Sequence, residues 1–260
     1  KELIKQVSVN MERLRWLPDT TVNEFILVNI ANYGMDYIRE MDTLLHSNAI
    51  VGKTYRKTPV FNAGMSYLVF SPTWTVPPTI LKNDVIPAVK KNLNYLTAKN
   101  MRILDFSGQE INPSTINWKS VNGNNFKYMV RQDPGKDNAL GQVKFMFPNK
   151  HNVYIHDTPS RTLFSKEDRA LSSGCIRIQK PFELAKLLLA DQPDWTDELI
   201  KKAMSSSKAQ SVSLTRKIPV IILYLTFWTD SKGKEQVRKD IYSRDDELFL
   251  LLQKPVINTN

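Results

Sequence analysis

Two short runs of β-forming residues, each with a reactive side chain at one end, constrain the possible folds of this chain more than any other part of its sequence. The run 153–155 cannot extend beyond His156, because Asp157-Thr158-Pro159 does not continue a strand. Further along, Ser172-Ser173-Gly174 is a small-residue turn that leads into Cys175. The sequence therefore predicts that its only cysteine and one of its three histidines lie at strand ends.

A strand over residues 175–178 would alternate its side chains between two faces. Ile176 and Ile178 then face a core, whereas Cys175 and Arg177 share the opposite, open face. A thiol beside a guanidinium and within reach of an imidazole has the surroundings that lower its pKa and produce a nucleophilic thiolate. The structural alternative is a small buried cysteine and a histidine that only makes hydrogen bonds. The spacing alone proves no contact between them.

These residues resemble the signature of the L,D-transpeptidases, bacterial cell-wall enzymes with a YkuD-type catalytic domain. The pattern is His-x-Thr, a loop, and Ser-x-Gly-Cys-x-Arg, and the variant His-Asp-Thr-Pro with Ser-Ser-Gly-Cys-Ile-Arg is similar to the large periplasmic branch typified by YcbB. The resemblance covers roughly residues 24–245. It includes four further segments in the same order: Val51-Gly52-Lys53 with Lys57-Thr58-Pro59, residues 71–78, Leu140-Gly141 and Lys144-Phe145.

We expect a mostly β fold with helices (α+β). The resemblance implies a YkuD-like β-sandwich or barrel as the catalytic domain, with an α+β cap subdomain inserted into it. The expected boundaries are an N-terminal helix and linker over 1–22, the catalytic domain over 23–74 and 140–260, and the cap over 75–139. The alternative for the insert is a second scaffold layer with no role in substrate binding.

Apolar periodicity predicts several elements inside these boundaries. Helices are expected over 2–16, over 83–99 with Pro87 in the first turn, after Pro181, and over 195–204 with a cap at Asp194 or Thr196. Residues 219–228 and 235–242 are expected to form a hairpin around 231–233. We interpret His46 as structural and His151 as part of an exposed loop.

The net charge of +10 favours an anionic partner, such as nucleic acid, an anionic membrane surface or an acidic polymer. The chain has no zinc-ligand spacing, no aromatic RNA-binding motif and no concentrated basic helix, so nucleic acid is not expected. Cell wall and anionic envelope lipid suit the same charge. A cysteine acyl-transfer site needs no metal, and the sequence has no metal-ligand cluster, so no cofactor is expected.

The sequence contains no signal peptide and no apolar run long enough to span a bilayer. It starts at Lys-Glu-Leu without methionine, from which we expect a piece of a longer protein. Export to the periplasm or cell envelope is implied by the resemblance alone. Envelope proteins are possible partners on the same ground.

The residues suggest two-step acyl transfer. Cys175 attacks an amide carbonyl, and His156 shares its proton, protonates the leaving amine and later deprotonates the incoming one. The oxyanion is expected on backbone N–H groups of Cys175 and of Gly174 or Ser173, in the loop that Ser172 opens. Arg177 either binds a substrate carboxylate or braces the loop.

The remaining expected substrate contacts surround this pair. Tyr154 lies two residues before His156 on the same strand face and should line the cleft. Trp74 lies at the hinge of the insert and is a candidate wall, and Asp157 and Thr158 follow the histidine directly. Many relatives have Gly or Ser in place of Asp157 and a second histidine in place of Ser173. Either a backbone carbonyl or Asp157 itself therefore orients His156.

The resemblance implies a peptidoglycan tetrapeptide stem as donor, cut after its L-configured third residue (usually diaminopimelate) with release of D-Ala. The acceptor would be the side-chain amine of another stem, which gives a 3→3 cross-link, and carbapenems would acylate Cys175. Three alternatives stay open: hydrolysis of the same thioester by an L,D-carboxypeptidase or endopeptidase, a non-catalytic wall-binding module, and a redox-sensing cysteine.

Overall fold

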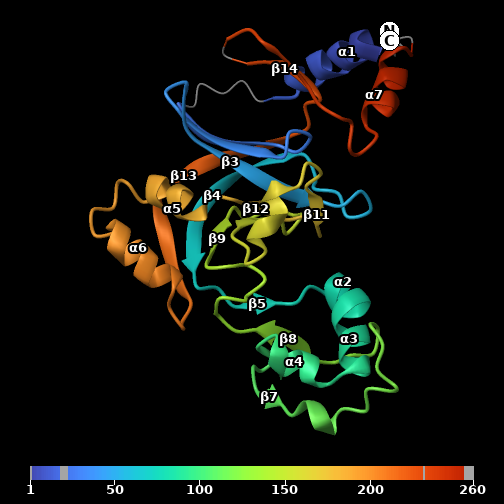
Figure 1. Ribbon diagram of the computed structural model, residues 1–260, viewed down its shortest axis with the longest axis vertical. Coiled ribbons are helices and arrows are strands. Elements are labelled where there is room, and N and C mark those ends of the chain that lie inside the picture. The colour runs from blue at the N-terminus through green and yellow to red at the C-terminus, as the bar shows by residue number, and fades with distance from the viewer. Residues whose placement is uncertain (1, 18–22, 231, 255–260) are drawn as a thin grey trace, which may run out of the picture.

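The main part of the molecule is a β-barrel (Figure 1). The computed structural model describes residues 2–17, 23–230 and 232–254. In this part of the chain, the largest sheet has the strand order β11-β3-β12-β10-β9-β4-β13-β1-β2. Because β2 also pairs with β3, the strands from β3 round to β2 close on themselves, and β11 is attached to β3 outside this circuit.

The strands of this sheet are β1 (Glu24–Asn29), β2 (Gly34–Arg39), β3 (Asp42–Gly52), β4 (Phe61–Phe70), β9 (Val143–Met146), β10 (Ile155–His156), β11 (Ala170–Ser172), β12 (Ile176–Ile178) and β13 (Gln210–Leu223). Most neighbours are antiparallel, but three pairs are parallel: β10 with β12, β1 with β13 and β11 with β3. The mixed sheet and its flanking helices confirm the α+β class.

The barrel surrounds one apolar core. Ile155 of β10, Ile176 and Ile178 of β12 and Phe145 of β9 are all fully buried in it. Their alternation with half-buried neighbours is the period of two that was predicted for residues 175–178. Burial of these isoleucines therefore fixes the register in which the intervening polar side chains meet on the other face.

Residues 74–132 contain a separate small sheet with its own core. Its strands are β5 (Trp74–Thr75), β6 (Met101–Leu104), β7 (Glu110–Ile111) and β8 (Met129–Gln132), in the order β5-β8-β6-β7. Val76, Val85, Ile103 and Val130 are among its buried residues. Figure 1 shows this unit beside the barrel, on the side opposite to α1 and α7. The domain boundaries named above stay predictions.

Helices cover the barrel at two places. The helix α1 (Glu2–Arg15) lies next to α7 (Asp245–Leu252), joined by a buried ion pair between Arg13 and Asp245 at 2.6 Å (Figure 1). The helices α5 (Pro181–Leu188) and α6 (Asp197–Met204) follow β12. As predicted, Pro181 lies in the first turn of α5 and the Thr196 hydroxyl caps α6 by accepting from the Leu199 N–H. No helix of the described segments has both the length and the apolar character that crossing a bilayer requires.

The helix predicted over 83–99 starts earlier and is broken. It runs as α2 (Pro78–Ile80), a π-helical stretch (Leu81–Val85) and α3 (Ile86–Lys91), and α4 (Asn94–Ala98) follows a break. Pro87 is the second residue of α3 and so lies in the first turn of that helix, as predicted. The π-helical stretch ends two residues earlier, at Val85, and the first turn of a helix tolerates a residue that lacks an N–H. The break comes at Asn92, whose backbone is extended (φ −155°, ψ 111°).

The predicted strand over 219–228 was wrong in both bounds. The strand β13 begins at Gln210 and ends at Leu223, and a new strand, β14 (Phe227–Thr229), pairs with β15 (Glu235–Val237). A hairpin is thus present, but Ser231 of its predicted turn lies outside the described residues, as do residues 18–22 of the predicted linker. The helix α7 was not predicted.

Candidate active site

The parallel pairing of β10 with β12 brings the two reactive residues onto one face of the sheet. In this register Ile155 lies opposite Ile176, and His156 lies opposite Arg177. One step earlier, the Ile176 N–H donates to the Tyr154 carbonyl at 3.1 Å. Tyr154, His156, Cys175 and Arg177 therefore share the face opposite the buried isoleucines, with Cys175 beside Tyr154 and diagonal to His156.

The loop before Cys175 is held by buried hydroxyl groups. Gly174 has a φ of +119°, a conformation that residues with a Cβ rarely adopt. The Ser172 hydroxyl donates to the Cys175 carbonyl at 2.6 Å and accepts from the Gly174 N–H at 3.0 Å. The Thr58 hydroxyl donates to the Gly174 carbonyl at 2.8 Å, so both ends of the turn are fixed.

Two N–H groups of the same loop have no acceptor. Within the described residues, the N–H groups of Ser173 and Cys175 donate to nothing. The Gly174 N–H is already engaged by Ser172, which removes it from the predicted oxyanion donors. The exposed Ser173 hydroxyl, in turn, accepts from the Arg56 guanidinium at 2.9 Å.

Cys175 is a thiol at rest, contrary to our expectation of a stabilised thiolate. Burial raises the pKa of Cys175, and hydrogen bonds from Tyr154 and the charge of Arg177 oppose that shift without overcoming it. The half-buried thiol donates to the Asn152 carbonyl with an S···O distance of 3.9 Å. The sequence displayed the guanidinium but not the burial around the sulfur, which is why the predicted direction was wrong.

His156 is held in one tautomer by a main-chain carbonyl. Its Nδ1 donates to the Asp157 carbonyl at 2.5 Å, which leaves the lone pair on Nε2. Burial, together with the charges of Arg177 and Lys144, lowers the pKa of His156 to about 3, although hydrogen bonds with the Asp157 and Leu140 backbone oppose that shift. The imidazole is therefore neutral at physiological pH. Of the two orienting groups considered from the sequence, the structure contains the carbonyl.

The Asp157 carboxylate is directed away from His156. It accepts from the Gln142 N–H and from Arg161, each at 2.9 Å, and the side chain is buried. Burial raises its pKa, which the two donors oppose. Thr158 is 2% exposed, and its hydroxyl accepts from the Ser160 N–H. Both side chains thus hold the loop after β10, and their contact with substrate stays a prediction.

Aromatic and cationic side chains surround the pair. The Tyr154 and His156 ring centroids lie 5.6 Å apart. Burial raises the pKa of Tyr154, and so does Cys175, whereas a hydrogen bond from Trp74 and the charge of Arg177 lower it. Trp74, the first residue of β5, therefore reaches Tyr154 from the unit of residues 74–132. This contact brings the predicted Trp74, Tyr154, Cys175 and Arg177 into one site.

Sequence reasoning missed Arg56, Thr58, Lys144 and Asn152. Thr58 and Lys144 lie in segments that carried the family resemblance, which is the only signal that pointed to them. Arg56 links Ser173 to Asp84 of the small unit, at 2.9 and 3.5 Å. Asn152 has a positive φ of 53°, which no pattern in the sequence indicates.

The other two histidines lie outside this site. His46 pairs with Asp36 across β2 and β3 at 2.6 Å, and this hydrogen bond raises its pKa. The exposed His151 ring packs on Phe61, with centroids 4.8 Å apart. The structural interpretation of His46 and the loop position of His151 both agree with these contacts.

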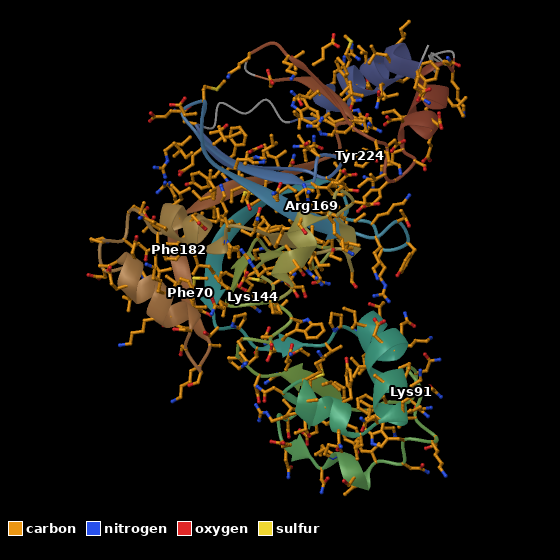
Figure 2. The ribbon with its side chains drawn as sticks, viewed as in Figure 1. Phe70, Lys91, Lys144, Arg169, Phe182 and Tyr224 are labelled. Atoms are coloured by element: carbon orange, nitrogen blue, oxygen red, sulfur yellow. The ribbon has the colours of Figure 1, made fainter. Side chains whose placement is uncertain are left out.

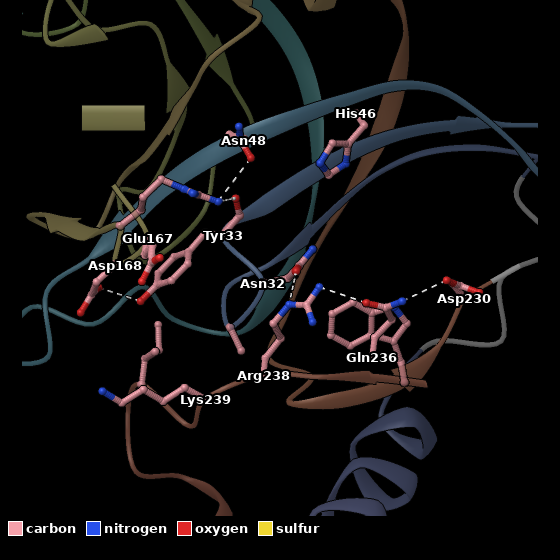
Figure 3. A pocket seen from close by; sticks show the side chains of 14 residues that line it. Asn32, Tyr33, His46, Asn48, Glu167, Asp168, Asp230, Gln236, Arg238 and Lys239 are labelled. Carbon is pink, nitrogen blue, oxygen red and sulfur yellow. Dashed lines mark hydrogen bonds between the residues drawn. The ribbon is translucent and has the colours of Figure 1, made fainter. Parts of the chain in front are cut away.

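A pocket of about 730 Å³ lies apart from Cys175, between the barrel and the β14–β15 hairpin (Figure 3). Several of its polar side chains bind one another. Tyr33 donates to Asp168 at 2.8 Å, and Arg238 donates to Asn32 at 2.7 Å. Gln236 bridges Arg238 and Asp230 in the same way (Figure 3). These contacts engage Tyr33, Asp168, Gln236 and Arg238, whereas Glu167 and Lys239 also line the pocket.

Two sequence matches identify the family of this chain. Residues 23–222 match the family model YkuD, the L,D-transpeptidase catalytic domain. The chain is 38% identical over 248 residues to a Haemophilus influenzae protein named "Putative L,D-transpeptidase", covering 95% of this chain and 50% of that protein. It thus spans about half the length of this curated relative.

Solved structures give weaker likenesses. An L,D-transpeptidase from Mycobacterium smegmatis is 12% identical, with a TM-score of 0.37 over 77% of this chain and 58% of that one. The catalytic domain of an E. faecium L,D-transpeptidase acylated by ertapenem is 13% identical, with a TM-score of 0.35 over 78% and 99%. The assignment rests on the sequence matches: the chain belongs to the YkuD family of L,D-transpeptidase catalytic domains.

Proposed function

We propose that this chain is a peptidoglycan L,D-transpeptidase that forms 3→3 cross-links by acyl transfer through Cys175. The observation that carries the proposal is the register of β10 and β12, which puts Cys175, His156 and Arg177 on one face of the sheet. Family membership supplies the reaction class, and the substrate is inferred from it.

The uncharged resting pair sets the order of proton transfers. The Cys175 thiol gives its proton to Nε2 of His156 as the sulfur attacks the donor carbonyl, because neither group is ionised beforehand. The imidazolium then protonates the leaving amine, D-Ala departs, and a thioester remains. An acceptor amine attacks the thioester, His156 takes its proton, and the thiol is regenerated.

The two unpartnered N–H groups of the cysteine loop are the proposed oxyanion donors. Those of Ser173 and Cys175 have no acceptor in the described structure, whereas that of Gly174 does. Fixed donors of this kind contribute roughly 3–4 kcal/mol to transition-state stabilisation. Ser172 and Thr58 hold the loop before substrate arrives, so the donors need no reorganisation.

Arg177 is the proposed contact for a carboxylate on the retained part of the donor. The Arg177 side chain is half-buried, its buried Nε has no hydrogen-bond partner, and no carboxylate of the described residues pairs with it. A buried guanidinium without a counterion favours binding of an anion. Tyr154 and Trp74 form the proposed wall above it.

The donor is a tetrapeptide stem cut after its L-configured third residue, and the acceptor is the side-chain amine of a second stem. We place the chain in the YcbB-like branch, with residues 75–139 as a cap over the cleft, and in the periplasm or cell envelope. Carbapenems are the expected covalent inhibitors. Stem peptides and envelope proteins are the proposed partners.

One experiment tests the nucleophile and the reaction together. The protein and its Cys175→Ala variant are incubated with a carbapenem, and intact mass is measured. We expect one adduct on the parent protein and none on the variant. Both are then given a disaccharide-tetrapeptide: dimers indicate transpeptidation, whereas tripeptide alone indicates hydrolysis. Absence of both adduct and product would refute the proposal.

A further inference from the structure

Two cations flank His156 in a single row across the sheet. In the pairing of β10 with β12, His156 lies opposite Arg177, and in the pairing of β10 with β9 it lies opposite Lys144. Directly opposed residues project to the same face. The row beyond Lys144 continues with the apolar Val69 of β4. Lys144 is therefore the last charged side chain of this row on the β9 side.

Lys144 is a half-buried lysine without a counterion. No carboxylate of the described residues forms an ion pair with it, and its Nζ lies 6.0 Å from the Tyr154 ring centroid. Burial lowers its pKa. Figure 2 shows Lys144 on the side of the barrel that faces the unit of residues 74–132. Such a lysine gains from an anion that arrives with the substrate.

The order of the strands gives the direction of the bound peptide. Crossing from β12 through β10 to β9, the residues in register are Arg177, His156 and Lys144, and Cys175, which directly precedes β12, is diagonal to His156 on the Arg177 side. In the proposed reaction the attacked carbonyl lies at Cys175 and the leaving nitrogen lies at His156. The rest of the leaving residue must continue toward β9. Its carboxylate is two bonds from that nitrogen, and neighbouring strands are about 4.8 Å apart, within reach of a lysine side chain.

Resting on the proposed function, we propose that Lys144 binds the free carboxylate of the leaving residue and so restricts the donor to peptides that end there. Arg177, on the Cys175 side, is left for the retained part of the donor. The site would then select acidic peptides at two points, one on each side of the scissile bond. An amidated or extended C-terminus would meet Lys144 without the charge that the lysine requires.

The test compares two donors that differ only in that charge: a tetrapeptide with a free C-terminal carboxylate and the same peptide as its C-terminal amide. Release of the terminal residue is followed for the parent protein and for Lys144→Met, Lys144→Arg and Lys208→Met. Lys208 is exposed on the loop before β13 and is the matched control. We expect a free-acid preference in kcat/KM of roughly 10- to 100-fold, the contribution of one charge-assisted hydrogen bond.

We expect Lys144→Met to lose that preference through a higher KM for the free acid, so that its kcat/KM values for the two donors become similar. Lys144→Arg should keep most of the preference, and Lys208→Met all of it. A parent protein that cleaves both donors equally would overturn the inference without any variant. So would a Lys144→Met variant that retains the preference. If the parent protein cleaves neither donor and forms no carbapenem adduct, it is the proposed function that fails.

Discussion

Replacement of Thr58 by valine should destabilise the protein and release the cysteine loop. The Thr58 side chain is fully buried, its hydroxyl donates to the Gly174 carbonyl at 2.8 Å, and it accepts from the Gly52 N–H at 2.9 Å. Valine has the same shape but leaves both backbone groups without a partner. At about 1–3 kcal/mol for each buried unsatisfied group, the expected loss in free energy of unfolding is about 2–6 kcal/mol.

Thr58→Ser separates the hydrogen bonds from the packing. Serine keeps the hydroxyl and removes one methyl group, which costs about 0.5–1.5 kcal/mol in a packed core. The valine variant should therefore lose more stability than the serine variant. Thr97→Val, at an exposed position of α4, is the control and should change stability by less than about 0.5 kcal/mol.

Urea unfolding measures the loss, and amide hydrogen exchange locates it. Thr58→Val should speed exchange at the Gly52 amide, which loses its acceptor, before it affects amides elsewhere in the barrel. Carbapenem acylation should slow in parallel, because the Gly174 carbonyl no longer fixes the turn before Cys175. Equal losses for the valine and serine variants would refute the reasoning, because they would assign the effect to packing alone.

Three further predictions follow from single contacts. Because the pKa of Cys175 is raised, iodoacetamide should alkylate this residue slowly at pH 7, and the alkylation rate should still rise above pH 9. Intact mass measures the rate, and a rate that levels off below pH 8 would contradict the thiol state. Gly141→Ala should lower the free energy of unfolding in urea by roughly 2–5 kcal/mol, because φ is +63° and the new Cβ would lie 2.3 Å from an Asp157 carboxylate oxygen. An unchanged unfolding midpoint would show that the loop accommodates the methyl group without strain. Arg13→Met should lower the free energy of unfolding by about 3–5 kcal/mol, because it leaves the buried Asp245 without a partner. Adding Asp245→Leu should restore much of that stability. Thermal unfolding of both variants tests this, and a single variant as stable as the parent would count against the ion pair.

Sequence patterns correctly predicted those elements whose structure depends on residues nearby in the sequence. The alternation at residues 175–178, the proline start of α5 and the Thr196 cap of α6 each depend on neighbours within four residues. The first half of β13 was missed because residues 210–217 are mostly polar and exposed, so they show no buried face. They extend because they pair with β4, which is distant in the sequence.

The same distinction applies to the candidate site. Cys175, His156 and Arg177 could be identified because their chemistry is unusual in the sequence and their motif resembles a family signature. The ionisation state of Cys175 could not, because it depends on burial by β10 and on Tyr154. Nor could the place of Lys144, because the register of β9, β10 and β12 aligns three segments that no local pattern connects.

The neutral state of His156 depends in part on Arg177 and Lys144, two cations without a counterion in the described part of the chain. Arg177 and Lys144 both disfavour an imidazolium between them and so help to keep His156 neutral. A donor carboxylate on either cation would cancel part of that repulsion and raise the proton affinity of His156. Transfer of the Cys175 proton would then become favourable when an acidic donor is bound. The site would thus generate its thiolate in response to substrate, which limits side reactions of the sulfur when no donor is bound.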